Sequence, residues 1–372
     1  MRRRLLLALA AAPLAGYSPR SDGSPRKPET GRCWKMGFSP TPPRPTVEAV
    51  LHGIDLWSQR AELAIIHEEL PWTDLLAGMT PGAILERDKV QLVDYLRSKG
   101  LQIVFMGDLN DGLSRDKEAP QLRAAGRSIA EPEVQQLYRD YMLAVDRVLK
   151  PQMLGLIAES NLIRILAPEM YPAAVQTAND TAAALRDAGS TTTLFASVQV
   201  EAAWGRLGDI GSPGPYVGVE EDFADFPFIQ QLGLSSYPYL GWAEPEHLPS
   251  NYYKRLLGGR RVPVMVTEGG WASSNAGTLS SHPRIQARYI KRQADLLDGV
   301  KATAWLQLLF ADVDLSSVPP PIPESLPLFT SIGLVDGDFE PKPALAIWDR
   351  LFARPWCKRS VGPFVVRVDQ AT

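Results

Sequence analysis

Two glutamates of the sequence, Glu159 and Glu268, each follow directly on a short apolar segment, residues 153–158 and 262–267. An acidic side chain beside a buried segment loses part of its hydration, which is costly unless the carboxylate has a partner or a role. Cleavage of a glycosidic bond uses two carboxyl groups that flank the bond, one as acid and the other as nucleophile or base. The pair is therefore predicted to be catalytic; the alternative for each is an ion pair with a loop Arg or Lys.

The ends of the other predicted strands carry side chains that could contact a sugar. The candidates for substrate binding are His67, Asp108, Asn110, Asn161, Gln199, Glu201, Tyr237, Trp271 and Trp305. We expect Trp305 to form the floor under the sugar at the cleavage point, and Glu201 is the second-choice carboxylate. Structural alternatives exist, because Asp and Asn also form turns and tryptophans also serve as packing residues. This chemistry needs no metal and no organic cofactor, and the sequence has no Cys/His metal cluster.

The apolar segments that precede these residues recur along the chain and predict eight strands. They lie near residues 34–38, 63–67, 102–106, 153–158, 193–200, 232–236, 262–267 and 302–308. Longer amphipathic stretches between them predict helices, and such alternation is typical of a parallel sheet covered by helices. Eight units within 372 residues favour a closed (β/α)8 barrel, which takes about 250 residues or more. We expect a single catalytic domain over residues 31–358.

This arrangement explains why residues far apart in the sequence could act together. Active sites of such barrels lie at the carboxyl ends of the strands. Glu159 and Glu268 end the fourth and seventh predicted strands, which lie across the mouth of an eight-stranded barrel. The helices expected around the barrel include residues 46–60, 81–98, 133–150, 283–297 and 343–353, with Thr46 and Thr80 as N-caps.

Two of these motifs resemble a known group of enzymes. The stretch Val264-Met-Val-Thr-Glu268-Gly-Gly-Trp271 is similar to the nucleophile strand of the clan A retaining glycoside hydrolases, whose mark is a glutamate at the ends of strands four and seven. Residues 232–239 resemble the sixth strand of the arabinogalactan endo-β-1,4-galactanases. The resemblance spans about residues 34–355. It implies that Glu268 is the nucleophile, Glu159 the acid/base and Tyr237 the hydrogen-bond partner of the nucleophile.

One position departs from the clan pattern and keeps other functions open. Ala158 stands where the clan has an Asn immediately before the acid/base, and Asn161 is the candidate to replace it. An inverting or transglycosylating enzyme could use the same site. A catalytically silent carbohydrate-binding barrel is the alternative from outside enzymology.

The composition and the chain ends indicate where the protein works. A net charge of −3 gives no electrostatic footprint for nucleic acid. Residues 1–17 resemble an export signal, with three arginines before an apolar stretch, and Tyr17 replaces the Cys that a lipid anchor would need. Residues 18–30 are predicted to be a disordered tether and 359–372 a tail. We expect an exported protein, periplasmic or extracellular, with no stable membrane insertion of the mature chain and a carbohydrate as its partner.

Only two cysteines are present, Cys33 before the first predicted strand and Cys357 after the last predicted helix. Both places lie at the bottom of a closed barrel, where strands begin and helices end. An oxidising compartment permits a disulfide between them. The alternative is a pair of free buried thiols.

Overall fold

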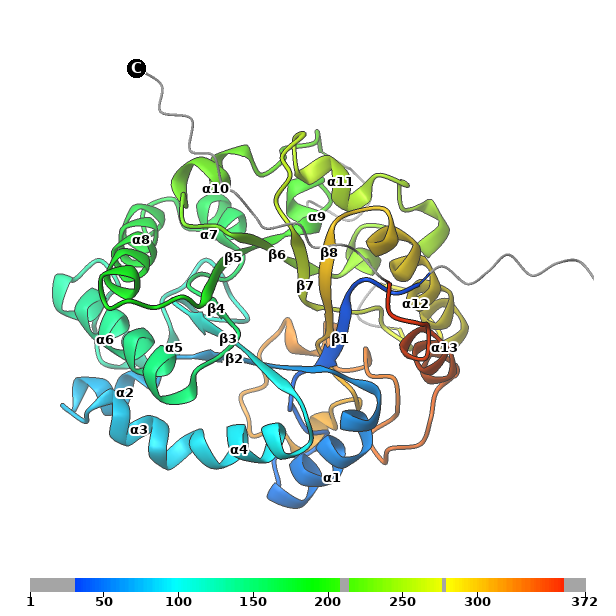
Figure 1. The fold of residues 1–372 in the computed structure, drawn as a ribbon, viewed down its shortest axis with the longest axis horizontal. Helices are drawn as coiled ribbons and strands as arrows, with labels where there is room; N and C mark the ends of the chain where they lie inside the picture. Colours follow the sequence, from blue (N-terminus) through cyan, green and yellow to red (C-terminus); the bar gives the residue numbers. More distant parts are fainter. Residues whose placement is uncertain (1–30, 208–213, 276–278, 358–372) are drawn as a thin grey trace, which may run out of the picture.

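Eight parallel strands close into a barrel in the computed structural model, which describes residues 31–207, 214–275 and 279–357 (Figure 1). The strands are β1 (Lys35–Phe38), β2 (Leu63–Glu69), β3 (Gln102–Asp108), β4 (Met153–Gly155), β5 (Thr193–Gln199), β6 (Gln231–Ser236), β7 (Val264–Gly269) and β8 (Ala302–Gln307). Each strand pairs with the next, and β8 pairs with β1. The predicted (β/α)8 barrel is confirmed. The predicted segments 1–17, 18–30 and 359–372 lie outside the described residues.

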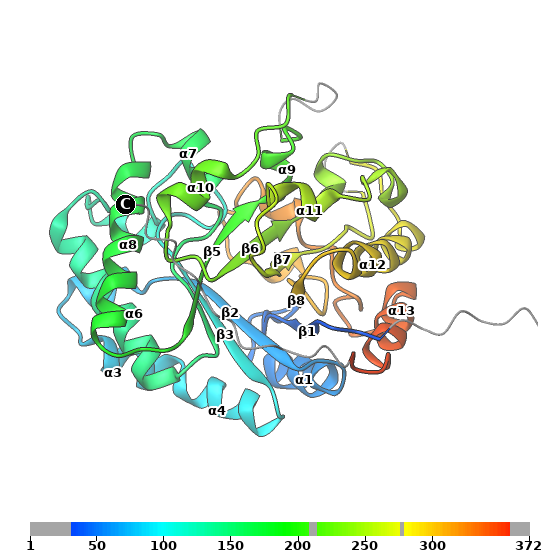
Figure 2. The ribbon, with the colours of Figure 1, turned by 45° about the horizontal axis from the view of Figure 1, so that its top comes forward.

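Helices surround the barrel on its outside (Figures 1 and 2). The longer ones are α1 (Val47–Trp57), α3 (Pro81–Asp88), α4 (Val90–Ser98), α6 (Pro132–Leu149), α8 (Tyr171–Asp187), α12 (Pro283–Asp298) and α13 (Pro343–Phe352). Short helices lie in the connections: α2 (Trp72–Leu76), α5 (Pro120–Ala124), α7 (Ser160–Leu166), α9 (Val200–Ala203), α10 (Glu220–Asp225) and α11 (Tyr252–Leu256). No helix of the described residues is both long and apolar enough to cross a membrane.

The helix N-caps follow the sequence, but one predicted helix is broken. Thr46 and Thr80 accept hydrogen bonds from the backbone N–H groups of Ala49 and Ala83 at the starts of α1 and α3. The single helix expected over residues 81–98 is wrong, because the backbone leaves the helical region at Lys89 (φ −125°, ψ −35°) and divides it into α3 and α4. The ammonium group of Lys89 reaches back to the carboxylate of Glu68 in β2.

The core has two layers, as the pleat of the strands requires. Side chains that point into the barrel form a small inner cluster made of Leu63, Ile65, Val104, Met106, Ala158, Phe195, Met265, Ala304 and Leu306. The opposite faces of the strands pack against the helices in a much larger cluster. The position of Gly155 in β4 has no room for a side chain, because a Cβ atom there would lie 2.4 Å from Sδ of Met106 and 2.6 Å from the ring of Phe195.

The two ends of the described chain are joined at the bottom of the barrel. Cys33 and Cys357 form a disulfide with Cα atoms 5.1 Å apart, across a sequence separation of 324 residues. The backbone N–H of Arg32 donates to the carbonyl of Pro355, and that of Cys357 donates to the carbonyl of Arg32. These contacts hold the segment after α13 beside the start of β1.

We expect the disulfide to contribute to the stability of the barrel, because it closes nearly the whole described chain into one loop. A Cys33→Ser/Cys357→Ser variant should lose about 2–4 kcal/mol of its free energy of unfolding. Denaturant titration with and without reductant measures this. Reductant should destabilise the wild type to the level of the variant and leave the variant unchanged. Equal stability of the wild type and the variant in the absence of reductant would contradict the expectation.

Candidate active site

Glu159 is placed at the mouth of the barrel by a strained turn between β4 and α7. After β4 ends, the chain stays beside β5, where the N–H of Leu156 donates to the carbonyl of Phe195 (3.0 Å). The backbone of Glu159 is left-handed, with φ 48° and ψ 45°, a conformation that costs energy for a residue other than glycine. Its N–H donates to Oγ of Ser197 (3.0 Å), and its carbonyl accepts from the first turn of α7. The side chain is 10% exposed.

Glu268 is aimed at the same mouth by an irregularity in β7. Leu234 of β6 pairs with Val266, but the next residue, Ser235, pairs with Glu268, so Thr267 is an extra residue in the ladder. Such a bulge changes which side of the sheet the following side chain faces. Thr267 bonds the carbonyl of Leu234 through its hydroxyl. Glu268, 7% exposed, thus lies beside Ser235 and lines the same pocket as Glu159.

Two cations, the buried Arg115 and the mostly buried His67, connect the acidic groups. His67, at the end of β2, bonds Asp108 through Nε2 (2.8 Å) and Glu268 through Nδ1 (3.2 Å). Arg115, from the loop after β3, bonds Asp108 through one terminal nitrogen (2.6 Å) and Glu159 through Nε (2.8 Å). The chain of contacts therefore runs from Glu268 through His67, Asp108 and Arg115 to Glu159. The ion pair with a loop Arg, named above as the alternative for Glu159, is present.

These contacts set the protonation of His67 and Asp108, two of the inner members of this series. Burial alone would lower the pKa of His67, but the carboxylates of Asp108 and Glu268 raise it to about 10. Burial alone would raise the pKa of Asp108, but Arg115 and His67 hold it at about 2. At neutral pH, His67 is therefore an imidazolium ion that donates from both ring nitrogens.

The two glutamates are shifted in opposite directions. Burial, reinforced by the nearby charge of Glu268, raises the pKa of Glu159 even though Arg115 lowers it. Burial also acts to raise the pKa of Glu268, but the charge and hydrogen bond of His67 outweigh it and lower that pKa. The hydroxyl of Ser235 donates to Oε1 of Glu159 and also stabilises the charge of Glu268, so one hydroxyl lies against both carboxyl groups. The two surroundings therefore differ, and Glu159 holds a proton more readily than Glu268 does.

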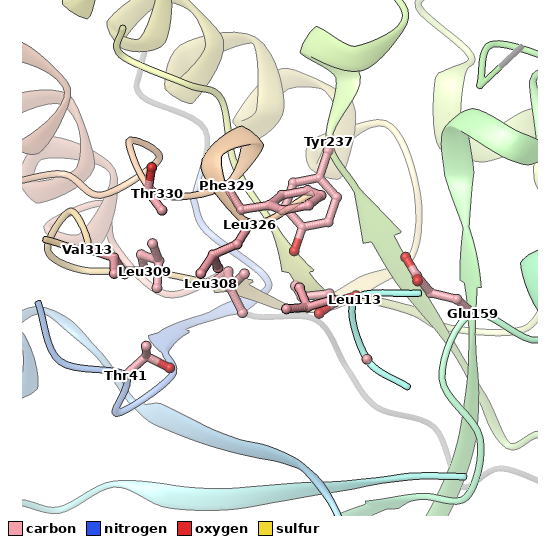
Figure 3. A pocket seen from close by; sticks show the side chains of 12 residues that line it. Thr41, Leu113, Glu159, Tyr237, Leu308, Leu309, Val313, Leu326, Phe329 and Thr330 are labelled. Carbon is pink, nitrogen blue, oxygen red and sulfur yellow. The ribbon is translucent and has the colours of Figure 1, made fainter. Parts of the chain in front are cut away.

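A pocket of about 190 Å³ opens over the two glutamates (Figure 3). Tyr237 lines it from the end of β6, and its ring meets that of Phe329 edge-on at 4.8 Å between centroids. Burial and the charges of Glu268 and Glu159 raise the pKa of the Tyr237 phenol, so it stays protonated. The remaining lining residues are Thr41, Gly112, Leu113, Leu308, Leu309, Val313, Leu326 and Thr330.

Three of the predicted sugar-binding residues are occupied elsewhere. The amide of Asn161 bonds both the N–H and the carbonyl of Gln199, and so ties α7 to β5. The Gln199 side chain accepts from the N–H of Ala202 at the start of α9 and donates to Glu201. Asn110 bonds the backbone carbonyl and the guanidinium of Arg115. Asn161 does not fill the place of the Asn that Ala158 replaces, and these three amides position the loops instead.

The two predicted tryptophans also lie away from the pocket. Trp305 is fully buried between Trp34 and Trp348, with ring centroids 5.8 and 4.7 Å away. It cannot form the floor of the sugar site, because its neighbours in β8, Ala304 and Leu306, point into the barrel and Trp305 faces the helices. Trp271 is 1% exposed and donates from its indole nitrogen to Ser281.

Glu201 is a buried carboxylate behind the pocket. It accepts from the backbone N–H of Tyr237 (3.0 Å), the hydroxyls of Tyr252 and Ser236, and the side-chain amide of Gln199 (2.7 Å). Burial outweighs these donors and raises the pKa of Glu201 to about 7. Its contacts position the end of β6, from which Tyr237 enters the pocket.

Arg115 and Ser235 are the functional residues that the sequence analysis missed. Arg115 comes seven residues after Asp108 in an irregular loop, and no spacing rule predicts that its guanidinium turns back over the barrel. Ser235 did carry a signal, since it is a small polar residue near the end of an apolar strand. The described residues show no group of three or more His, Cys, Asp or Glu arranged to hold a metal ion.

The comparisons with known proteins agree on the fold. The sequence matches no protein-family model and no curated protein. One similar solved structure is an exo-β-1,4-mannosidase from an Opitutaceae bacterium, strain TAV5, with a TM-score of 0.63 at 16% identity. The match covers 87% of this chain but only 59% of the mannosidase chain. A GH5_18 protein from Streptomyces cattleya, solved with GlcNAc, has a TM-score of 0.62 at 17% identity, covering 87% of this chain and 80% of its own. A β-glucosidase has a TM-score of 0.55 at 16% identity, and the match covers 84% of this chain and 89% of the β-glucosidase.

The charge of His67 gives a test that needs no substrate. The chain has four histidines, so their ring signals can be resolved by NMR and assigned with a His67→Gln variant. We expect His67 to titrate near pH 10. An Asp108→Asn variant should titrate at lower pH, because it removes a negative charge that stabilises the imidazolium. A His67 midpoint near its ordinary value of about 6.5 would contradict the arrangement.

Proposed function

We propose that this protein is a glycoside hydrolase that cleaves β-glycosidic bonds in two steps with retention of configuration. Glu268 is the nucleophile and Glu159 is the acid/base. The observation that supports this most directly is that two carboxyl groups line one pocket in different surroundings, Glu268 against the His67 cation and Glu159 against Ser235 and Arg115, which shift their pKa values in opposite directions. Retaining hydrolysis needs one carboxylate to attack while its neighbour supplies a proton.

In the first step, the Glu268 carboxylate attacks the anomeric carbon while Glu159 protonates the leaving oxygen. His67 holds the carboxylate of Glu268 through Nδ1 and so limits its orientation. In the second step, Glu159 takes a proton from water, which hydrolyses the glycosyl ester on Glu268.

The surrounding charges favour this exchange of roles. Before the reaction, the cations His67 and Arg115 balance the anions Asp108 and Glu268, while Glu159 is neutral. When Glu268 forms the ester it loses its negative charge, and Glu159 gains one as it gives up its proton. The buried cluster therefore has a net charge of zero in both states, which avoids the high cost of an unbalanced buried charge.

A silent carbohydrate-binding barrel is the second candidate. Two observations favour it: Ala158 in place of the clan's Asn, and the ion pair between Arg115 and Glu159. Such a protein would bind an oligosaccharide without releasing reducing sugar. The galactanase-type specificity suggested by residues 232–239 stays a prediction.

Export is also part of the proposal. The apolar segment behind three arginines in the sequence and the disulfide between Cys33 and Cys357 both fit an oxidising compartment outside the cytoplasm. A carbohydrate is the proposed partner of the exported chain.

Variants of the two glutamates should separate their roles. With an aryl β-glycoside as substrate, Glu268→Ala should reduce hydrolysis to background, and Glu159→Ala should lower kcat by about 10²–10⁴-fold for poor leaving groups. Added azide should then yield an α-glycosyl azide from Glu268→Ala and a β-glycosyl azide from Glu159→Ala. Glu86→Gln, on the exposed face of α3, is the control and should behave as wild type. Azides of the opposite configurations would reverse the assignment.

The pH dependence of kcat/KM should be bell-shaped. Its acidic limb should lie below the ordinary glutamate value of 4.5, where Glu268 becomes protonated, and its basic limb above 4.5, where Glu159 loses its proton. Arg115→Met should move the basic limb to higher pH, because the Arg115 charge lowers the pKa of Glu159. Arg284→Met, on the exposed side of α12, should leave both limbs in place. A basic limb that moves to lower pH in Arg115→Met would contradict the assignment.

A further inference from the structure

One wall of the pocket is apolar and comes almost entirely from the connection between β8 and α13. Its members are Leu308, Leu309, Val313, Leu326 and Phe329. Leu113, from the loop after β3, lines the pocket as well, and the hydroxyl of Ser325 donates to its backbone carbonyl (3.0 Å). This bond joins the two loops, and the side chains that bound the pocket on this side are aliphatic except for Phe329.

The wall offers little to sugar hydroxyl groups. Among the described residues that line this side of the pocket, only Thr41 and Thr330 have a side-chain hydroxyl. A sugar hydroxyl placed against leucine and valine loses its hydrogen bonds to water without replacement, which costs binding energy. The wall therefore favours an apolar substituent. Phe329 is the aromatic member of the wall, and its ring meets that of Tyr237 edge-on, so leucine and valine make up the rest of the wall.

The position of the wall indicates which part of the substrate meets it. Glu159 follows β4, whereas the wall follows β8, on the opposite side of the closed barrel. Figure 3 shows the same separation, with Glu159 at one end of the pocket and Leu309 and Val313 at the other. The acid/base must lie beside the leaving group, so the far side of the pocket receives the sugar unit whose anomeric carbon is attacked.

On the basis of the proposed function, we propose that this wall selects a sugar unit with an apolar substituent at the cleavage point, a 6-deoxyhexose with a methyl group in place of the hydroxymethyl group. The pocket volume of about 190 Å³ is below the roughly 300–1,000 Å³ of sites for drug-sized ligands, which suits a single sugar ring.

The test compares matched substrates with the same nitrophenyl leaving group. The β-D-fucoside and the β-D-galactoside differ only at C6, and the 6-deoxyglucoside and glucoside form a second pair. We expect kcat/KM to favour the deoxy sugar by about 10–100-fold, the range in which an apolar pocket rejects an added hydroxyl. Val313→Thr and Leu326→Gln should reduce this preference. Ile322→Gln is the control, because Ile322 lies exposed in the same connection and does not line the pocket.

Binding to a Glu268→Gln variant keeps this test independent of turnover. Calorimetry with the methyl β-glycosides of the same pairs should show the same preference and the same loss in Leu326→Gln. If the deoxy sugars bind better but wild type hydrolyses nothing, the proposed function fails and the inference stands. If wild type hydrolyses both sugars of each pair equally, the function stands and the inference is overturned. The inference is also overturned if neither sugar of a pair binds. It is likewise overturned if an octyl glycoside binds more tightly than the methyl glycoside and this gain in affinity is lost in Leu326→Gln, because the wall would then contact the leaving group.

Discussion

The charge balance of five mostly buried groups at the mouth of the barrel is the constraint on which the rest of the site depends. Arg115 and Asp108 are buried, and the side chains of His67, Glu159 and Glu268 have only 13%, 10% and 10% of their surface exposed. Two cations can compensate only two anions, so one of the three carboxyl groups is favoured as a neutral acid. Asp108 contacts both cations and keeps its charge. Glu268 is held by His67, whereas burial and the charge of Glu268 raise the pKa of Glu159, so Glu159 is the carboxyl group of the three that is protonated most readily.

The barrel supplies this cluster by bringing together strand ends that are far apart in the sequence. β2, β3, β4 and β7 contribute one carboxyl or imidazole group each, and a single hydroxyl from β6 lies against both glutamates. Two local irregularities complete the geometry: the left-handed turn at Glu159 and the extra residue Thr267 in β7. Both are departures from ideal structure at the site itself, where such strain commonly accompanies function.

Sequence reasoning predicted the barrel and the placement of the two glutamates because both follow from simple periodicity. Apolar segments separated by amphipathic stretches define the strands, and the residue after a strand lies at the mouth. The same reasoning failed for Trp305, where the alternation within β8 turns the ring toward the helices. It also failed for Asn161 and Gln199, whose amides bond backbone groups of other loops. Arg115 was missed since the path of an irregular loop depends on its tertiary contacts.

Trapping the covalent bond between Glu268 and the sugar tests the proposed mechanism most directly. A 2-deoxy-2-fluoro analogue of a hydrolysed aryl β-glycoside slows the second step more than the first, so the glycosyl-enzyme accumulates. Mass spectrometry of the digested protein is predicted to find one sugar per chain on the peptide that contains Glu268. Attachment to another residue, or continued turnover with no adduct and with inverted product, would contradict the account.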